Sequence, residues 1–217
     1  CLAMANAFVK AGMAREILLV TADTYSKYIN NKDRSTRVLF GDGAAATIVK
    51  DSNEKRGIID VDLRSSGSGY DKFWIPAGGL RLPESDITSV ETEDDRGNKR
   101  TQNDIAMDGF GVWSFINSVV PKQINRLMKK NNVKKNVIDQ FIFHQASQMT
   151  LESIIKILKL DKEKVFINIY DIGNTVSASI PIALKDAIEQ DKIDTGSKVI
   201  LSGFGVGLSY GAILMDL

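Results

Sequence analysis

The sequence predicts a layered α/β fold, in which short apolar strands alternate with amphipathic helices. Several brief runs of apolar residues, flanked by polar ones, are typical of buried strands. From residue 111 to residue 217 the pattern follows the order helix, strand, helix, strand, helix, strand, strand. Such an alternation favours a sheet that is covered by helices. A chain of 217 residues is long enough to bury a substantial core of this kind.

The composition argues against several classes of protein. The chain is 43% hydrophobic and 25% charged, as in ordinary globular proteins. Its net charge of +1 gives no reason to expect nucleic acid or an acidic membrane surface as a partner. Its apolar runs are too short to span a bilayer, so we expect no membrane association. A single cysteine excludes an internal disulfide and fits a reducing cytosol, so we expect a cytoplasmic protein.

The first half is predicted to contain one helix and three strands. The helix occupies residues 2–11 and ends at Gly12, a residue favoured just after a helix. The strands occupy residues 17–20, 47–49 and 58–63. The first strand is expected to be buried and parallel, because its residues are apolar throughout. The third alternates apolar and polar residues, which predicts a strand with one covered face.

A long irregular segment follows these strands. Residues 65–104 are rich in glycine, proline and charge, and residues 91–100 are predicted to be a solvated surface loop. We place the main internal boundary at its end, which divides the chain into residues 1–104 and 105–217.

Helical periodicity returns at about Gly111 and continues to Lys130, with Pro121 inside it. A proline at this position predicts a kink or two successive helices. The remaining predicted strands are residues 137–143, 165–169, 199–201 and 209–215, and the remaining helices are residues 150–158 and 175–189.

His144, the only histidine, directly follows a predicted strand. The carboxyl ends of strands are where open α/β sheets form their ligand crevices. A lone histidine is more often structural than catalytic, but a second polar residue follows the same pattern. Thirty positions later (174 minus 144), Asn174 lies in a sharp glycine turn between a predicted strand and a predicted helix.

Five short stretches carry a resemblance to a known family. They are residues 33–36, 40–44, 144–146, 173–175 and 203–207. In order and spacing they resemble the thiolase-fold condensing enzymes, closest to β-ketoacyl-acyl carrier protein synthase III. The resemblance implies a layered αβαβα fold built from a duplicated unit, in a dimeric protein. Residues 1–104 would then form the C-terminal part of the first repeat together with an insertion loop, so the first repeat would be incomplete. Residues 105–217 would form the second repeat.

The resemblance also implies an activity. The family joins an acyl thioester to malonyl-acyl carrier protein by decarboxylative Claisen condensation, in fatty acid or related acyl biosynthesis. The expected partners are then acyl-CoA and acyl carrier protein, and their thioesters are the expected substrates. The protein is expected to be a homodimer and to need no metal or cofactor. His144 and Asn174 match the family's pair of neutral donors, which would stabilise negative charge on the thioester oxygen as CO₂ leaves.

Further site residues are carried over from the family. The backbone N–H of Val206 matches a donor of a second oxyanion hole. The residues that match coenzyme A or pantetheine contacts are Arg34, Gly109, Phe110, Ser147 and Phe204. Phe110 and Ser147 each replace a usual asparagine, and Val206 replaces a frequent glycine. The departures at Phe110 and Ser147 bear on the identity of the acyl donor and on the pantetheine contacts, whereas valine at position 206 keeps the N–H but narrows the room beside it.

Cys1 has the right chemistry for the family's nucleophile, because a thiolate attacks thioesters readily. Its spacing does not fit. Cys1 lies 32 positions before Asp33 (33 minus 1), about six fewer than in the family. We therefore expect Cys1 to be a packing residue, the chain to be a fragment, and the nucleophile to lie upstream.

Two other functions are considered. One is a thiolase-fold acyltransferase that forms an ester or amide without decarboxylation, and the sequence leaves this open. The other is a non-catalytic partner subunit, against which the presence of both His144 and Asn174 argues.

Overall fold

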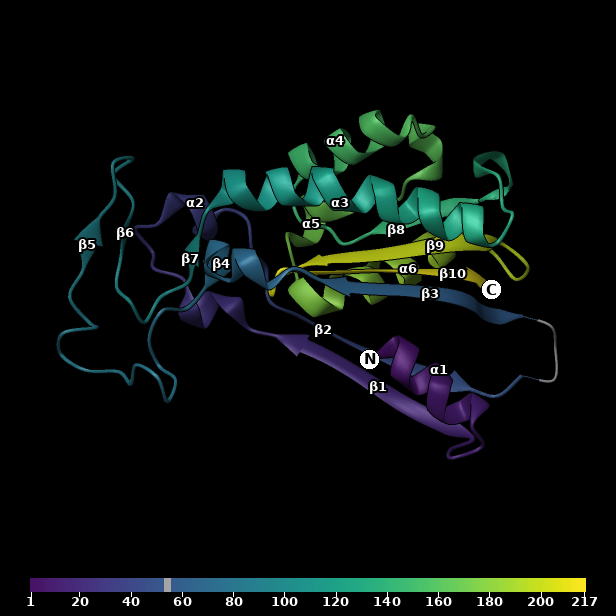
Figure 1. Ribbon diagram of the computed structural model, residues 1–217, viewed down its shortest axis with the longest axis horizontal. Helices are drawn as coiled ribbons and strands as arrows, with labels where there is room; N and C mark the ends of the chain where they lie inside the picture. The colour runs from purple at the N-terminus through teal and green to yellow at the C-terminus, as the bar shows by residue number, and fades with distance from the viewer. Residues whose placement is uncertain (53–55) are drawn as a thin grey trace.

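The computed structural model describes residues 1–52 and 56–217, and across these residues sheets and helices form alternating layers (Figure 1). The largest sheet of the described residues has four strands in the order β3, β10, β9, β8. These strands are β3 (Gly57–Ser65), β8 (Gln140–Phe143), β9 (Lys198–Gly205) and β10 (Ser209–Asp216). β8 is parallel to β9, whereas β10 is antiparallel to both of its neighbours.

Helices cover both faces of this sheet. α3 (Gly109–Lys130) and α4 (Gln148–Leu158) lie on one face, and α6 (Ser179–Glu189) lies on the other (Figure 1). All four residues of β8 are buried, because one face of this strand packs under α3 and α4 and the other under α6. The predicted buried strand before His144 is therefore confirmed.

A second sheet lies beyond α6. It pairs β1 (Glu16–Asp23) with β2 (Gly43–Lys50), and α1 (Leu2–Lys10) packs against both strands (Figure 1). The layers thus follow the order helix, sheet, helix, sheet. The prediction that β1 is buried and parallel is wrong. It runs antiparallel to β2, and every second residue is exposed, because no described residues cover the outer face of this ribbon.

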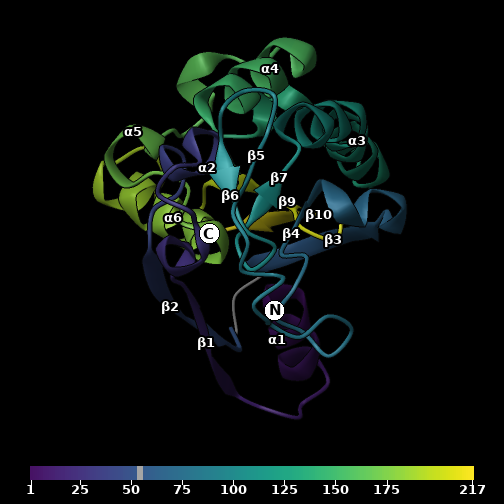
Figure 2. The same ribbon diagram turned by 90° about the vertical axis from the view of Figure 1, so that its left-hand side faces the viewer.

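Short elements gather at one end of the molecule, which faces the viewer in Figure 2. They include α2 (Arg34–Arg37), β4 (Phe73–Trp74), β5 (Thr92–Glu93), β6 (Lys99–Arg100) and β7 (Ala106–Met107), with 3₁₀ turns η1 (Tyr25–Tyr28) and η2 (Gly67–Lys72). β4 pairs with β7, and β5 pairs with β6. The predicted surface loop, residues 91–100, is mostly exposed but contains the β5–β6 hairpin.

Three predicted elements differ in the structure. α3 is one continuous helix through the buried Pro121, so two successive helices do not form. The strand predicted at residues 137–143 begins only at Gln140, after the 3₁₀ turn η3 (Lys135–Val137). Residues 165–169 form no strand.

Only a single bridge joins Val165 to Phe141, and α5 (Ile169–Ile172) follows. The reason lies at Asn168, whose backbone N–H bonds to the Gln145 side chain instead of to a neighbouring strand.

The predicted boundary after residue 104 separates strands that the structure joins. β3 lies before this boundary, yet it pairs with β10 along its whole length. The division into residues 1–104 and 105–217 stays a prediction. Of the helices in the described residues, none combines the length and the apolar character needed to cross a membrane.

Candidate active site

His144 extends from the carboxyl end of β8, as predicted. Its backbone N–H donates to the Ser202 carbonyl oxygen at 2.8 Å, which fixes the residue against β9. The imidazole ring meets the Phe204 ring edge-on, with 5.5 Å between the ring centroids. On its other side, Nδ1 lies 2.6 Å from Oγ of Ser179. The ring is therefore held by contacts from two different elements.

Burial lowers the pKa of His144 to about 4, because the charged imidazolium loses its hydration inside the protein. The ring is then neutral at pH 7, with one nitrogen able to donate and the other able to accept. No group of three or more acidic, histidine or cysteine side chains that could hold a metal ion occurs in residues 1–52 or 56–217.

Asn174 is brought to the site by the close approach of two glycine-containing turns. Its backbone N–H donates to Leu39 O at 2.9 Å, and its carbonyl oxygen accepts from Gly41 N–H at 3.0 Å. A Cβ atom on Gly41 would lie well inside contact distance of the Ile172 carbonyl oxygen. Gly173 has a φ of +67°, a conformation that L side chains rarely adopt. The two motifs therefore need glycine in order to meet.

The Asn174 side chain is fixed in orientation and is only 5% exposed. Its Oδ1 accepts the Val176 backbone N–H at 3.0 Å, and its Nδ2 donates to Ala146 O at 3.2 Å. These two bonds determine which end of the amide is nitrogen. A primary amide carries two N–H groups, so one remains to donate to a ligand.

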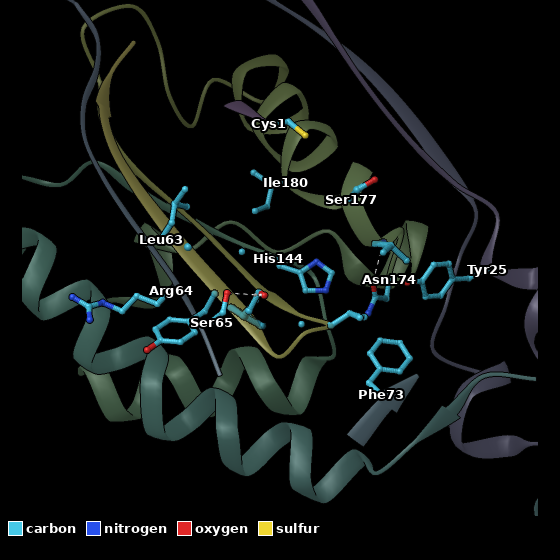
Figure 3. Close-up of a pocket in the computed structure, with 18 of the residues that line it drawn as sticks. Cys1, Tyr25, Leu63, Arg64, Ser65, Phe73, His144, Asn174, Ser177 and Ile180 are labelled. Atoms are coloured by element: carbon cyan, nitrogen blue, oxygen red, sulfur yellow. Dashed lines mark hydrogen bonds between the residues drawn. The ribbon is translucent and has the colours of Figure 1, made fainter. Parts of the chain in front are cut away.

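His144 and Asn174 line the same cavity, whose volume is about 820 Å³. Figure 3 shows the two side chains next to each other, with Tyr25 and Phe73 beside Asn174. A second cavity of about 600 Å³ is also lined by His144 and Asn174. The chain thus places two neutral N–H groups where two cavities meet.

The second cavity brings together four of the residues predicted to contact coenzyme A or pantetheine. They are Gly109, Phe110, Ser147 and Phe204. The Phe110 ring is 72% exposed and stacks on Trp113 with 6.0 Å between centroids. The Ser147 side chain accepts the Thr150 backbone N–H and so caps α4. The binding roles of these residues stay predictions.

Arg34 is not part of either cavity lining. It is exposed in the first turn of α2, and its backbone N–H donates to the Asn98 side chain at 3.2 Å. The cation that does line the second cavity is Arg96. Sequence reasoning missed Arg96, because it belongs to a charged loop whose composition indicates only solvent exposure.

Val206 and Cys1 both line the first cavity with His144 and Asn174. Val206 is 51% exposed and lies in the turn between β9 and β10. Cys1 is exposed and directly precedes α1 (Figure 3). The donor role of Val206 and the packing role of Cys1 stay predictions.

Sequence reasoning also missed a cluster of aromatic rings beside Asn174. Tyr25, Phe40 and Phe73 contact one another, with ring centroids 5.3 to 6.2 Å apart. Burial and the nearby Asp23 raise the pKa of Tyr25. These residues come from three separate segments, so no local pattern could have assembled them.

Comparisons with known proteins agree with this arrangement. Residues 1–67 match the family model of 3-oxoacyl-[acyl-carrier-protein] synthase III, and residues 128–217 match the model of its C-terminal part. The chain is 38% identical over 216 residues to the β-ketoacyl-[acyl-carrier-protein] synthase III of Clostridium tetani, covering 99% of this chain and 63% of that protein. It is 40% identical over 209 residues to the Clostridioides difficile protein of the same name, covering 96% and 61%.

Solved structures give the same result. A 2.1 Å crystal structure of a 3-oxoacyl-(acyl-carrier-protein) synthase III matches with a TM-score of 0.97 at 36% identity, covering 100% of this chain and 64% of that one. The fold is therefore thiolase-like, as predicted. The chain spans less than two thirds of the length of these relatives. On these matches, together with the His144 and Asn174 geometry, the chain belongs to the 3-oxoacyl-[acyl-carrier-protein] synthase III family.

Proposed function

We propose that the protein catalyses the decarboxylative Claisen condensation of an acyl thioester with malonyl-acyl carrier protein. The observation that carries this proposal is the pair of fixed neutral groups, the His144 ring and the Asn174 amide, on one cavity. Neither group has to gain or lose a proton in order to donate. Such preorganised donors favour a transition state in which negative charge develops on oxygen.

The reaction would proceed in two halves. A cysteine thiolate first attacks the thioester carbonyl and takes the acyl group, and coenzyme A leaves as its thiolate, which takes up a proton from solvent. The bond between the malonyl carboxylate and the α-carbon then breaks, CO₂ leaves, and the electron pair forms an enolate on the thioester oxygen. His144 and Asn174 donate to that oxygen. The enolate carbon attacks the acyl carbonyl, a carbon–carbon bond forms, and the cysteine thiolate departs.

The surroundings of the two donors support thioester substrates. The second cavity gives a bound arm a route past Gly109 and Ser147 toward His144. Acyl-CoA and acyl carrier protein are accordingly the proposed partners, and the acyl carrier protein occurs in the names of the relatives. We further propose that the protein is a cytoplasmic homodimer and that it needs no metal or cofactor.

The test separates the two halves of the reaction in the full-length gene product. His144→Ala and Asn174→Ala should each slow malonyl decarboxylation about a hundredfold, on the order of 3 kcal/mol, and leave acyl-enzyme formation unchanged. The double variant should be little slower than either single one, because both donors serve one charge. Gln148→Ala, at an exposed residue on α4, is the control and should behave as wild type.

Intact mass after incubation with acyl-CoA reports acyl-enzyme formation and locates the acylated cysteine. If the variants slow acyl-enzyme formation and malonyl decarboxylation equally and also melt at a lower temperature, His144 and Asn174 have a structural role. If the wild-type protein forms the acyl-enzyme, leaves malonyl thioesters intact and acylates alcohols or amines, the non-decarboxylating acyltransferase is correct instead.

A further inference from the structure

Ser179 holds one end of the His144 ring, and neither the sequence pattern nor the proposed reaction gave it a role. It is the first residue of α6 and is completely buried. Its Oγ lies 2.6 Å from His144 Nδ1 and 2.9 Å from the Val176 carbonyl oxygen. The hydroxyl has a single proton, so it can donate fully to only one of these two acceptors.

Two observations decide which acceptor receives the proton. The Val176 carbonyl already accepts the backbone N–H of Ser179, so it does not depend on the hydroxyl. The 2.6 Å contact to Nδ1 is also shorter than the range of roughly 2.7–3.2 Å that N–H donors make to oxygen, and shorter than the 2.9 Å contact of the hydroxyl to the Val176 carbonyl oxygen. Both favour a hydroxyl that donates to Nδ1 and a ring nitrogen that accepts.

The position of Ser179 at the start of a helix also favours a hydroxyl that donates to Nδ1. The N-terminus of α6 carries partial positive charge, which favours an electron-rich partner such as the Nδ1 lone pair. It disfavours an imidazolium at the same place. Burial independently keeps the ring neutral, with a pKa of about 4. A neutral ring that accepts at Nδ1 carries its only proton on Nε2.

We propose that Ser179 is a positioning residue that holds His144 in the tautomer with its proton on Nε2, ready to donate. The catalytic consequence rests on the proposed function, since a donor at Nε2 is what enolate stabilisation requires. The tautomer itself can be measured without turnover. A failure of the proposed function and a failure of this inference are therefore distinguishable.

The test exploits the single histidine of the chain. Protein labelled with ¹⁵N-histidine should show one pair of ring nitrogens at pH 7, with Nδ1 pyridine-like and Nε2 pyrrole-like. In Ser179→Ala the two signals should move toward the average of both tautomers, because no hydroxyl then favours one of them. Ser179→Thr keeps the hydroxyl and should restore the wild-type pattern.

Ser202→Ala is the matched control. Ser202 is also completely buried, its Oγ has no hydrogen-bond partner within residues 1–52 and 56–217, and it holds His144 only through its backbone oxygen. This variant should leave the ring signals unchanged. A pyrrole-like Nδ1 in the wild-type protein, or unchanged signals in Ser179→Ala, would overturn the inference.

A kinetic measurement adds the functional consequence. Ser179→Ala should slow malonyl decarboxylation roughly tenfold, by analogy with the outer partners of metal-binding histidines, whose loss costs about 10- to 100-fold. Acyl-enzyme formation should stay at the wild-type rate, and Ser179→Thr should recover decarboxylation. Slowing without any change in the ring signals would assign Ser179 a structural role and contradict the inference.

Discussion

The state of His144 is determined by burial, not by a neighbouring charge. Removal of water from the imidazolium is the cause of its lowered pKa. The fixed amide of Asn174 is uncharged at every pH of interest. The candidate site therefore offers two neutral donors over a wide pH range. Only in acid does the unfavourable protonation of the buried His144 ring reduce the stability of the protein.

This cost predicts a pH dependence of stability. The pKa of His144 is 6.5 in the unfolded chain and about 4 in the folded protein. Between these values the unfolded state binds a proton that the folded state does not, so the free energy of unfolding should fall as the pH drops from 6.5 to 4. The loss should be on the order of 3 kcal/mol at most, at about 1.4 kcal/mol for each pKa unit. This figure is an upper bound, because the His144 ring lines a cavity and is only partly buried. Urea unfolding at a series of pH values measures it.

His144→Gln is the control for that experiment. It removes the only histidine, so stability between pH 6.5 and pH 4.5 should become nearly independent of pH. The carboxyl groups of Asp42, Asp60, Asp62 and Asp94 have pKa values lowered from 3.8, so the stability that they contribute begins to fall only below about pH 5 and is lost mainly in stronger acid. An unchanged slope in the variant would show that burial does not govern the titration of His144.

At the scale of elements, the site depends on two turns that meet without forming a regular sheet. Phe40 and Asn174 form an isolated parallel bridge, and Gly41 closes the contact. This bridge joins a turn before β2 to a turn after α5, which lie far apart in the chain. Small changes in the turns should therefore displace Asn174 while leaving the central sheet intact.

Gly41→Ala tests this dependence. The added methyl group would overlap the Ile172 carbonyl oxygen, so the turns must separate, at a cost of about 1–3 kcal/mol. Decarboxylation should fall, because Asn174 moves with its turn. Gly67→Ala is the control, since a Cβ atom there meets nothing within 4 Å. Thermal unfolding and malonyl decarboxylation measure both variants. Wild-type values for Gly41→Ala would contradict the proposed closeness of the turns.

The elements also indicate what sequence can predict. The apolar run of β8 and the periodicity of α4 depend on local burial, and both elements form, although the strand begins at Gln140 instead of residue 137 and the helix at Gln148 instead of residue 150. The direction of β1 and the absence of a strand at residues 165–169 depend on distant partners that no local pattern reveals. The residues of the candidate site likewise differ in how far the sequence predicts them. His144 and Asn174 follow local motifs, whereas Ser179 and the Tyr25–Phe73 contact arise only from tertiary packing.

At the scale of the whole molecule, the layers differ in how well they are covered. The central sheet has helices on both faces, but the β1–β2 ribbon has one face without a covering element among the described residues. Leu18 and Ile48 are paired across the two strands on this face and are 65% and 68% exposed. Val20 and Ala46 form a second such pair. Neighbouring apolar pairs of this kind promote association.

The chain of residues 1–217 should therefore self-associate through this ribbon. Replacing Leu18 and Ile48 together by lysine should shift the protein toward monomer and reduce binding of a hydrophobic dye, because charge opposes burial of the face. The melting temperature should change little, since both side chains are already exposed. Val38→Lys is the matched control, because Val38 is 79% exposed but lies away from the ribbon, just after α2. Sedimentation velocity at several concentrations measures the effect, and equal association of the double variant and the control would exclude the ribbon as the contact surface.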